Sequence, residues 1–137
     1  MRSLNPAVLE RLRSWQDNPL RFVQECFKWP KDQGPTFQQK EALQAIAFRK
    51  RVSIRSGHGC GKSAVAVWIA LWFMSTRAYA KVAVTGPTGR QLYDIFWAEL
   101  AKWFRRSRLQ DEFVMQKGKF FYKAAPEDWW IRLISPR

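Results

Sequence analysis

A glycine-rich stretch that ends in a lysine and a serine holds the residue types best suited to chemistry. Residues 56–63 read SGHGCGKS, with glycines at every second position before Lys62 and Ser63. Glycines let backbone N–H groups turn toward a bound phosphate, the lysine can reach the β- and γ-phosphates, and the hydroxyl can ligate Mg²⁺. The stretch therefore predicts a phosphate-binding loop, although Ser56 stands where the pattern G-x-x-x-x-G-K-[ST] has its first glycine.

The residues on either side of this stretch predict the elements that must position it. RVSIRS (51–56) is β-branched and predicts a short strand. Residues 63–75 predict a helix that is apolar on nearly every face and must therefore be buried. Strand, loop and helix in this order form the context in which such a loop binds phosphate. A glycine-rich turn with an exposed Lys-Ser pair remains the alternative.

The rest of the chain alternates helical and strand patterns. Asn-Pro pairs at 5–6 and 18–19 predict helix starts, and Thr36 with Gln39 predicts a capping box. The order of elements indicates an α/β fold with a largely parallel central sheet. Besides the strand and helix around the loop, we expect helices over about 5–17 and 19–28, a loop over 28–35, a helix from Thr36, a strand over 81–87, a helix from Thr88 to about Arg108, and strands over 119–124 and 128–135.

The composition is that of a basic globular domain. The 137 residues include 24 Lys and Arg against 11 Asp and Glu, a net charge of +13, which suggests a polyanionic partner. Scattered, solvated charge is the alternative. The longest apolar run, 64–74, is 11 residues long, and a spanning helix needs about 20, so we expect no membrane segment. Cys26 and Cys60 have no metal-site or disulfide spacing, which indicates a reducing, cytoplasmic setting.

Basic residues gather in FRKR (48–51) and KWFRRSR (102–108). The second cluster, with Arg105, Arg106 and Arg108 beside two aromatic residues, could follow a nucleic-acid backbone. Cations at the end of a helix also favour the helix dipole, so both interpretations stay open.

Three segments together resemble a known family. IRSGHGCGKS, the later KVAVTGPTGRQLYDIFWAEL and the upstream GPTFQQKEALQAI are similar to the ATPase domain of the large terminase subunit of tailed bacteriophages, a viral DNA-packaging motor. The resemblance runs from about Asn18 to the last residue. It implies a P-loop NTPase-type core that binds ATP and Mg²⁺, with residues 1–35 as an N-terminal helical appendage and 36–137 as a partial ATPase domain. It also implies double-stranded DNA, a small terminase subunit and a portal protein as partners, in the host cell cytoplasm.

The resemblance assigns roles to individual residues. Gln38 would read the adenine edge, with Phe37 near the base, although a core position for Phe37 and a solvent position for Gln38 remain open. The triphosphate would be held by Ser56, Gly57, His58, Gly59, Cys60, Gly61, Lys62 and Ser63, with Lys62 as the catalytic cation and Ser63 on the metal. Thr85, Pro87, Thr88 and Gln91 match a turn that lies near nucleic acid in related motors. His58 stands where many packaging ATPases have an arginine, which leaves open whether His58, Arg55 or neither takes that role.

An acidic strand for hydrolysis is not evident. Asp111-Glu112 lacks a preceding apolar strand, and Glu127-Asp128 has the wrong order. We therefore expect that the chain is truncated before that strand and before the nuclease domain. Such a chain should bind ATP without hydrolysing it. A fragment of a helicase-like, nucleic-acid-dependent ATPase and a non-catalytic nucleotide- or DNA-binding module are the alternatives.

Overall fold

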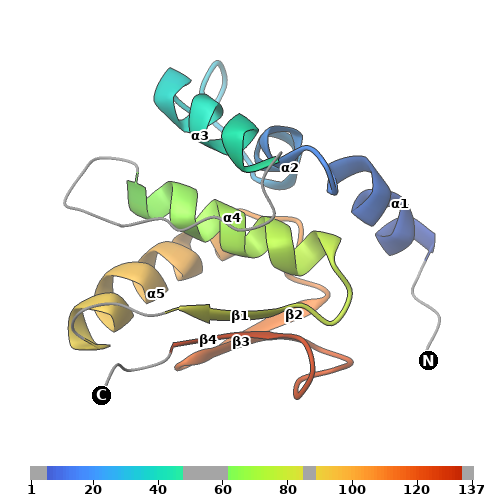
Figure 1. The fold of residues 1–137 in the computed structure, drawn as a ribbon, viewed down its shortest axis with the longest axis vertical. Coiled ribbons are helices and arrows are strands. Elements are labelled where there is room, and N and C mark those ends of the chain that lie inside the picture. Colours follow the sequence, from blue (N-terminus) through green and yellow to red (C-terminus); the bar gives the residue numbers. More distant parts are fainter. Residues whose placement is uncertain (1–5, 48–61, 85–88, 134–137) are drawn as a thin grey trace.

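In the described part of the computed structural model, five helices lie on one side of a four-stranded sheet (Figure 1). The structure describes residues 6–47, 62–84 and 89–133. No helix in these ranges combines the length and apolar character needed to cross a membrane. The elements are α1 (Pro6–Trp15), α2 (Pro19–Cys26), α3 (Phe37–Ala47), α4 (Lys62–Thr76), β1 (Lys81–Val84), α5 (Gly89–Arg105), β2 (Phe113–Gln116), β3 (Lys119–Tyr122) and β4 (Trp130–Leu133).

The sheet is mixed, with strand order β1-β4-β3-β2. β1 and β4 are parallel, whereas β4 with β3 and β3 with β2 are antiparallel. The prediction of an α/β fold is confirmed, and the prediction of a largely parallel sheet is wrong for the four described strands. The difference arises because a hairpin, β2–β3, separates α5 from β4. The strand expected over 51–56 lies outside the described residues.

The sequence predicted the second strand of the β2–β3 hairpin, over 119–124, but not the first. β2 and β3 are joined by Lys117 and Gly118, a two-residue turn. Gly118 has φ +82°, a left-handed conformation that glycine adopts without steric cost. The turn sets the register in which Phe113 lies opposite Tyr122.

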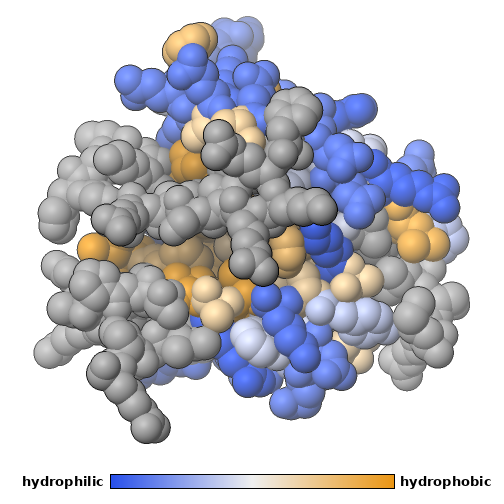
Figure 2. Space-filling view, viewed as in Figure 1, coloured by the Kyte–Doolittle hydropathy of each residue, from blue (hydrophilic) through white to orange (hydrophobic). Residues whose placement is uncertain are grey.

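Helix α4 runs through the centre of the core, as its uniformly apolar sequence predicts. Trp68, Leu71 and Met74 are fully buried, and α4 contacts α1, α2, α3, α5 and the sheet. Figure 2 shows apolar residues in the middle of the visible face, in the region of α4 and the sheet. The buried hydroxyl groups of Ser75 and Thr76 donate hydrogen bonds to the carbonyl of Trp72, which satisfies them without water.

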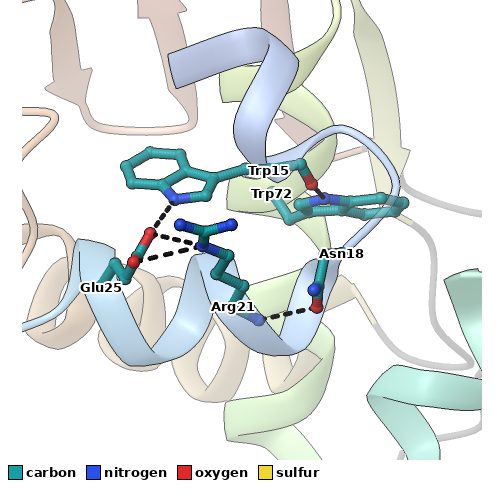
Figure 3. A network of polar contacts seen from close by, with 5 residues as sticks. All are labelled: Trp15, Asn18, Arg21, Glu25 and Trp72. Carbon is teal, nitrogen blue, oxygen red and sulfur yellow. Dashed lines mark hydrogen bonds and ion pairs between the residues drawn. The ribbon is translucent and has the colours of Figure 1, made fainter. Parts of the chain in front are cut away.

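The N-terminal helices share this core. Trp15 and Phe22 are buried in the same cluster as Trp68, and the indole of Trp72 donates to the carbonyl oxygen of Trp15 at 2.7 Å (Figure 3). Residues 6–35 are therefore joined to the rest of the described chain through one continuous set of buried side chains. Where they are described, the helix boundaries agree with the sequence predictions to within two residues, apart from the end of α5 at Arg105.

Both predicted helix caps within the described residues are present. The Asn18 side chain accepts a hydrogen bond from the backbone N–H of Arg21 at 3.0 Å, with Pro19 in the first helical position. Thr36 Oγ1 accepts from the Gln39 N–H at 3.2 Å, and Gln39 Oε1 accepts from the Thr36 N–H at 2.8 Å. This reciprocal pair is the predicted capping box, and it fixes where α3 begins.

Candidate functional site

The start of α4 places the predicted lysine and serine at one end of the sheet. Lys62 and Ser63 are the first two residues of α4, while residues 56–61 of the predicted loop, His58 and Cys60 among them, lie outside the described residues. Figure 1 shows the first turn of α4, the carboxyl end of β1 and the first turn of α5 on the same side of the molecule. The register pairs Val84 with Leu133, so β1 and the parallel β4 end at the same edge of the sheet.

Two general rules bear on this edge of the sheet. Ligands of α/β sheets bind beyond the carboxyl ends of parallel strands. The first turn of a helix has unpaired N–H groups and the positive end of the helix dipole. A lysine and a hydroxyl at the start of α4 add a cation and a hard oxygen ligand. Lysine and serine are the residue types that a triphosphate with Mg²⁺ requires at such a helix start, and the side chains of Lys62 and Ser63 lie outside the described part of the structure.

The two acidic pairs lie at the opposite edge of the sheet. Phe113 pairs with Tyr122, and Phe121 pairs with Trp130, so the start of β2 is aligned with the amino ends of β4 and β1. Asp111 and Glu112 immediately precede β2, and Glu127 and Asp128 precede β4. Neither pair is therefore on the edge where Lys62 and Ser63 begin α4.

The predicted adenine-binding residues are exposed at the start of α3. Phe37 has 74% of its surface accessible, and Gln38 is also exposed. The alternative that Phe37 packs in the core is therefore wrong, whereas Leu43, further along α3, is fully buried. An aromatic ring at this exposure can stack on a planar ligand.

A pocket of about 730 Å³ lies next to these residues, between α2 and α3. Its walls come from α2, the 28–35 loop and α3. Neither Phe37 nor Gln38 lines the pocket. Trp29 is the aromatic wall, and sequence reasoning missed it because one tryptophan in a proline-rich loop has no periodicity that distinguishes a pocket wall from core. The lining residues are Gln24, Trp29, Asp32, Gln33, Gly34, Pro35 and Lys40.

The predicted nucleic-acid residues fall into two groups that the structure does not bring together. Thr85 and Thr88 lie outside the described residues, and Gln91 belongs to the first turn of α5, with its side chain not described. Arg105, Arg106 and Arg108 lie at or beyond the other end of this 17-residue helix. A helix of this length spans about 25 Å, so Gln91 and the arginines lie far apart along α5.

The end of α5 is attached to the end of α2. Ser107 forms an antiparallel bridge with Phe27, the Lys28 N–H donates to the Arg106 carbonyl at 2.8 Å, and the Arg108 N–H donates to the Cys26 carbonyl at 3.0 Å. Arg105 and Arg108 remain exposed, whereas Arg106 is half-buried. Part of this basic cluster thus connects two helices within the chain.

Comparisons with protein-family models and with curated proteins assign neither a family nor a function to the chain. No known protein family matches the chain, and no curated protein matches it.

Proposed function

We propose that the chain is the ATP-binding portion of a P-loop motor ATPase of the terminase large-subunit type, which acts on double-stranded DNA in its complete form. The observation that carries the proposal is the position of Lys62 and Ser63, which open a buried helix on the side of the molecule where β1 ends (Figure 1). A glycine-rich loop that precedes a helix of this kind can hold a triphosphate at the helix N-terminus.

In this proposal the roles of the residues follow from their chemistry. The Lys62 ammonium neutralises charge on the β- and γ-phosphates, and the Ser63 hydroxyl ligates Mg²⁺. Phe37 and Gln38, both exposed at the start of α3, are available to the adenine base. Mg²⁺ would supply charge neutralisation between the phosphate oxygens.

The remaining partners belong to the complete motor. The excess of cations, 24 against 11 acidic residues, supports a polyanionic partner, and Lys102, Arg105 and Arg108 are exposed cations at or just beyond the end of α5. A small terminase subunit and a portal protein are proposed on the resemblance of the three sequence segments alone.

The metal role of Ser63 provides a direct test. Calorimetric titration with ATP should show tighter binding in Mg²⁺ than in EDTA for the natural chain, and Ser63→Ala should lose most of that difference. Ser63→Thr is the matched control, because the motif accepts either hydroxyl, and it should keep the Mg²⁺ preference. Equal Mg²⁺ dependence in all three proteins contradicts the proposal.

A further inference from the structure

The face of the sheet that points away from α4 and α5 carries both cations and aromatic rings. The inward side chains Phe113, Phe120 and Ile131 are buried beneath the helices. Because side chains alternate along a strand, their neighbours point the other way. We call this the outer face; its residues are Lys81 and Ala83 on β1, Trp130 and Arg132 on β4, Lys119 and Phe121 on β3, and Val114 and Gln116 on β2.

Two cations lie directly opposite each other on the outer face. Lys119 and Arg132 are paired in the register of β3 and β4, and like charges in this position destabilise a sheet. The carboxylate of Glu127 forms an ion pair with each of them. Its Oε1 lies 3.5 Å from Lys119 Nζ, and its Oε2 lies 3.6 Å from Arg132 Nη2. The side chain of Glu127 is 79% exposed, so these ion pairs are weak and a phosphate can replace the carboxylate.

A third cation extends this positive surface across β1. Lys81 is 4.0 Å from Asp128, whose side chain is 70% exposed. The outer face therefore has three cations against two highly exposed carboxylates.

An aromatic pair lies beside the cations. Phe121 and Trp130 are directly opposite each other in the register, two residues along their strands from Lys119 and Arg132. The Arg132 guanidinium lies 4.4 Å from the centre of the Trp130 ring, and Lys119 Nζ lies 5.3 Å from the Phe121 ring. Planar bases stack on aromatic rings and on guanidinium groups alike, and the adjacent cations can hold the phosphates.

We propose that the outer face binds single-stranded nucleic acid. Lys81, Lys119 and Arg132 contact phosphates, and the Phe121–Trp130 pair, with the Arg132 guanidinium, provides the stacking platform. The net charge of +13 favours a polyanion over an acidic surface patch of another protein. Unpaired bases are required, since a base inside a duplex does not offer its flat side to the ring. This binding does not depend on the nucleotide site at Lys62, so either proposal can fail alone.

The test is fluorescence anisotropy of a labelled oligothymidine with the 137-residue chain. Phe121→Leu should weaken binding roughly tenfold, because stacking is lost while apolar bulk is kept. Phe121→Tyr keeps the aromatic ring and should bind with the affinity of the natural chain. Lys119→Gln and Arg132→Gln should each lower the slope of log affinity against log salt by about 0.7. Glu127→Gln should tighten binding, since it removes the carboxylate that competes with phosphate.

Matched controls separate the outer face from general charge. Lys31→Gln in the 28–35 loop and Glu41→Gln on α3 change the same charges on other exposed positions and should leave the affinity much closer to that of the natural chain. Circular dichroism checks that each variant is folded. Equal effects at the control positions, an equal loss of duplex affinity in Phe121→Leu, or a change in self-association without a change in oligonucleotide affinity would each overturn the proposal.

Discussion

The guanidinium group of Arg106 donates two hydrogen bonds to the carbonyl oxygen of Lys28, from Nε at 3.2 Å and from Nη2 at 2.9 Å. The same group lies 4.4 Å from the ring centre of Trp103 and 5.4 Å from that of Trp29. Arg106 therefore connects the end of α5 to the loop that follows α2, and that loop lines the pocket beside α3.

Arg106→Ala should destabilise the protein, by about 1 kcal/mol, because it removes hydrogen bonds from a charged donor at a partly exposed position. Arg105→Ala, one residue away and exposed, should change stability by less than about 0.5 kcal/mol. Urea denaturation followed by tryptophan fluorescence measures both. Equal destabilisation would show that the Arg106–Lys28 contact contributes nothing of its own.

Gly118 controls the β2–β3 hairpin. An added Cβ meets nothing within 4 Å there, so Gly118→Ala tests the backbone conformation alone. Because φ is +82° at this position, Gly118→Ala should lower the free energy of unfolding by about 1 kcal/mol. Gly34→Ala, also in open space, is the control and should be close to neutral. Thermal denaturation of the two variants gives the comparison, and equal melting temperatures would contradict the assigned turn.

Glu25 makes stability depend on pH in acid. Its pKa lies below the ordinary value of 4.5, first because Trp15 Nε1 donates to the carboxylate at 2.7 Å (Figure 3), and then because Arg21 donates to it and Arg21 and Arg108 carry positive charge, while burial opposes the shift. Since the folded-state pKa is depressed, the stabilisation is present above 4.5 and is lost as pH falls through the folded-state pKa.

The stability difference between the natural chain and Glu25→Gln should therefore be constant near neutral pH and shrink below pH 4.5. Denaturant titrations at a series of pH values measure it. Glu41→Gln, exposed on α3, is the control for removing a carboxylate. A difference that persists unchanged into strong acid would contradict the contribution of the ionised Glu25.

Much of the fold follows from local sequence rules. The caps at Asn18 and Thr36 satisfy helix N–H groups with their own side chains, so a few residues suffice to predict them. The burial of α4 follows from its uniform apolarity. The hairpin could also have been found, since FVMQ-KG-KFFY is two apolar runs joined by a turn that ends in glycine.

Other features depend on contacts between distant segments. The antiparallel pairing of β3 with β4 is set by tertiary packing, which strand propensity does not encode. The contact of Arg106 with Lys28 joins residues 78 positions apart, so in sequence Arg106 was indistinguishable from the exposed Arg105. The opposed cations Lys119 and Arg132 require the strand register to be known.

Asp111 and Glu112 should have no part in any ATP turnover, because they precede β2 at the edge opposite the start of α4. Phosphoryl transfer depends on positioned charge at the phosphates, so we expect hydrolysis by this chain near background. A phosphate-release assay should give the same low rate for the natural chain, Asp111→Asn and Glu112→Gln. Robust turnover that is lost in either variant would contradict the placement of the site.

Binding of ATP by Lys62 is the central claim. The measurement is isothermal titration calorimetry with ATP and Mg²⁺ on the natural chain, Lys62→Ala and Lys117→Ala, the last being an exposed lysine of the hairpin turn. Loss of the cation that faces the β- and γ-phosphates should weaken binding by at least roughly tenfold in Lys62→Ala and leave Lys117→Ala unchanged. Equal affinity in Lys62→Ala and the natural chain would contradict a phosphate site at the start of α4.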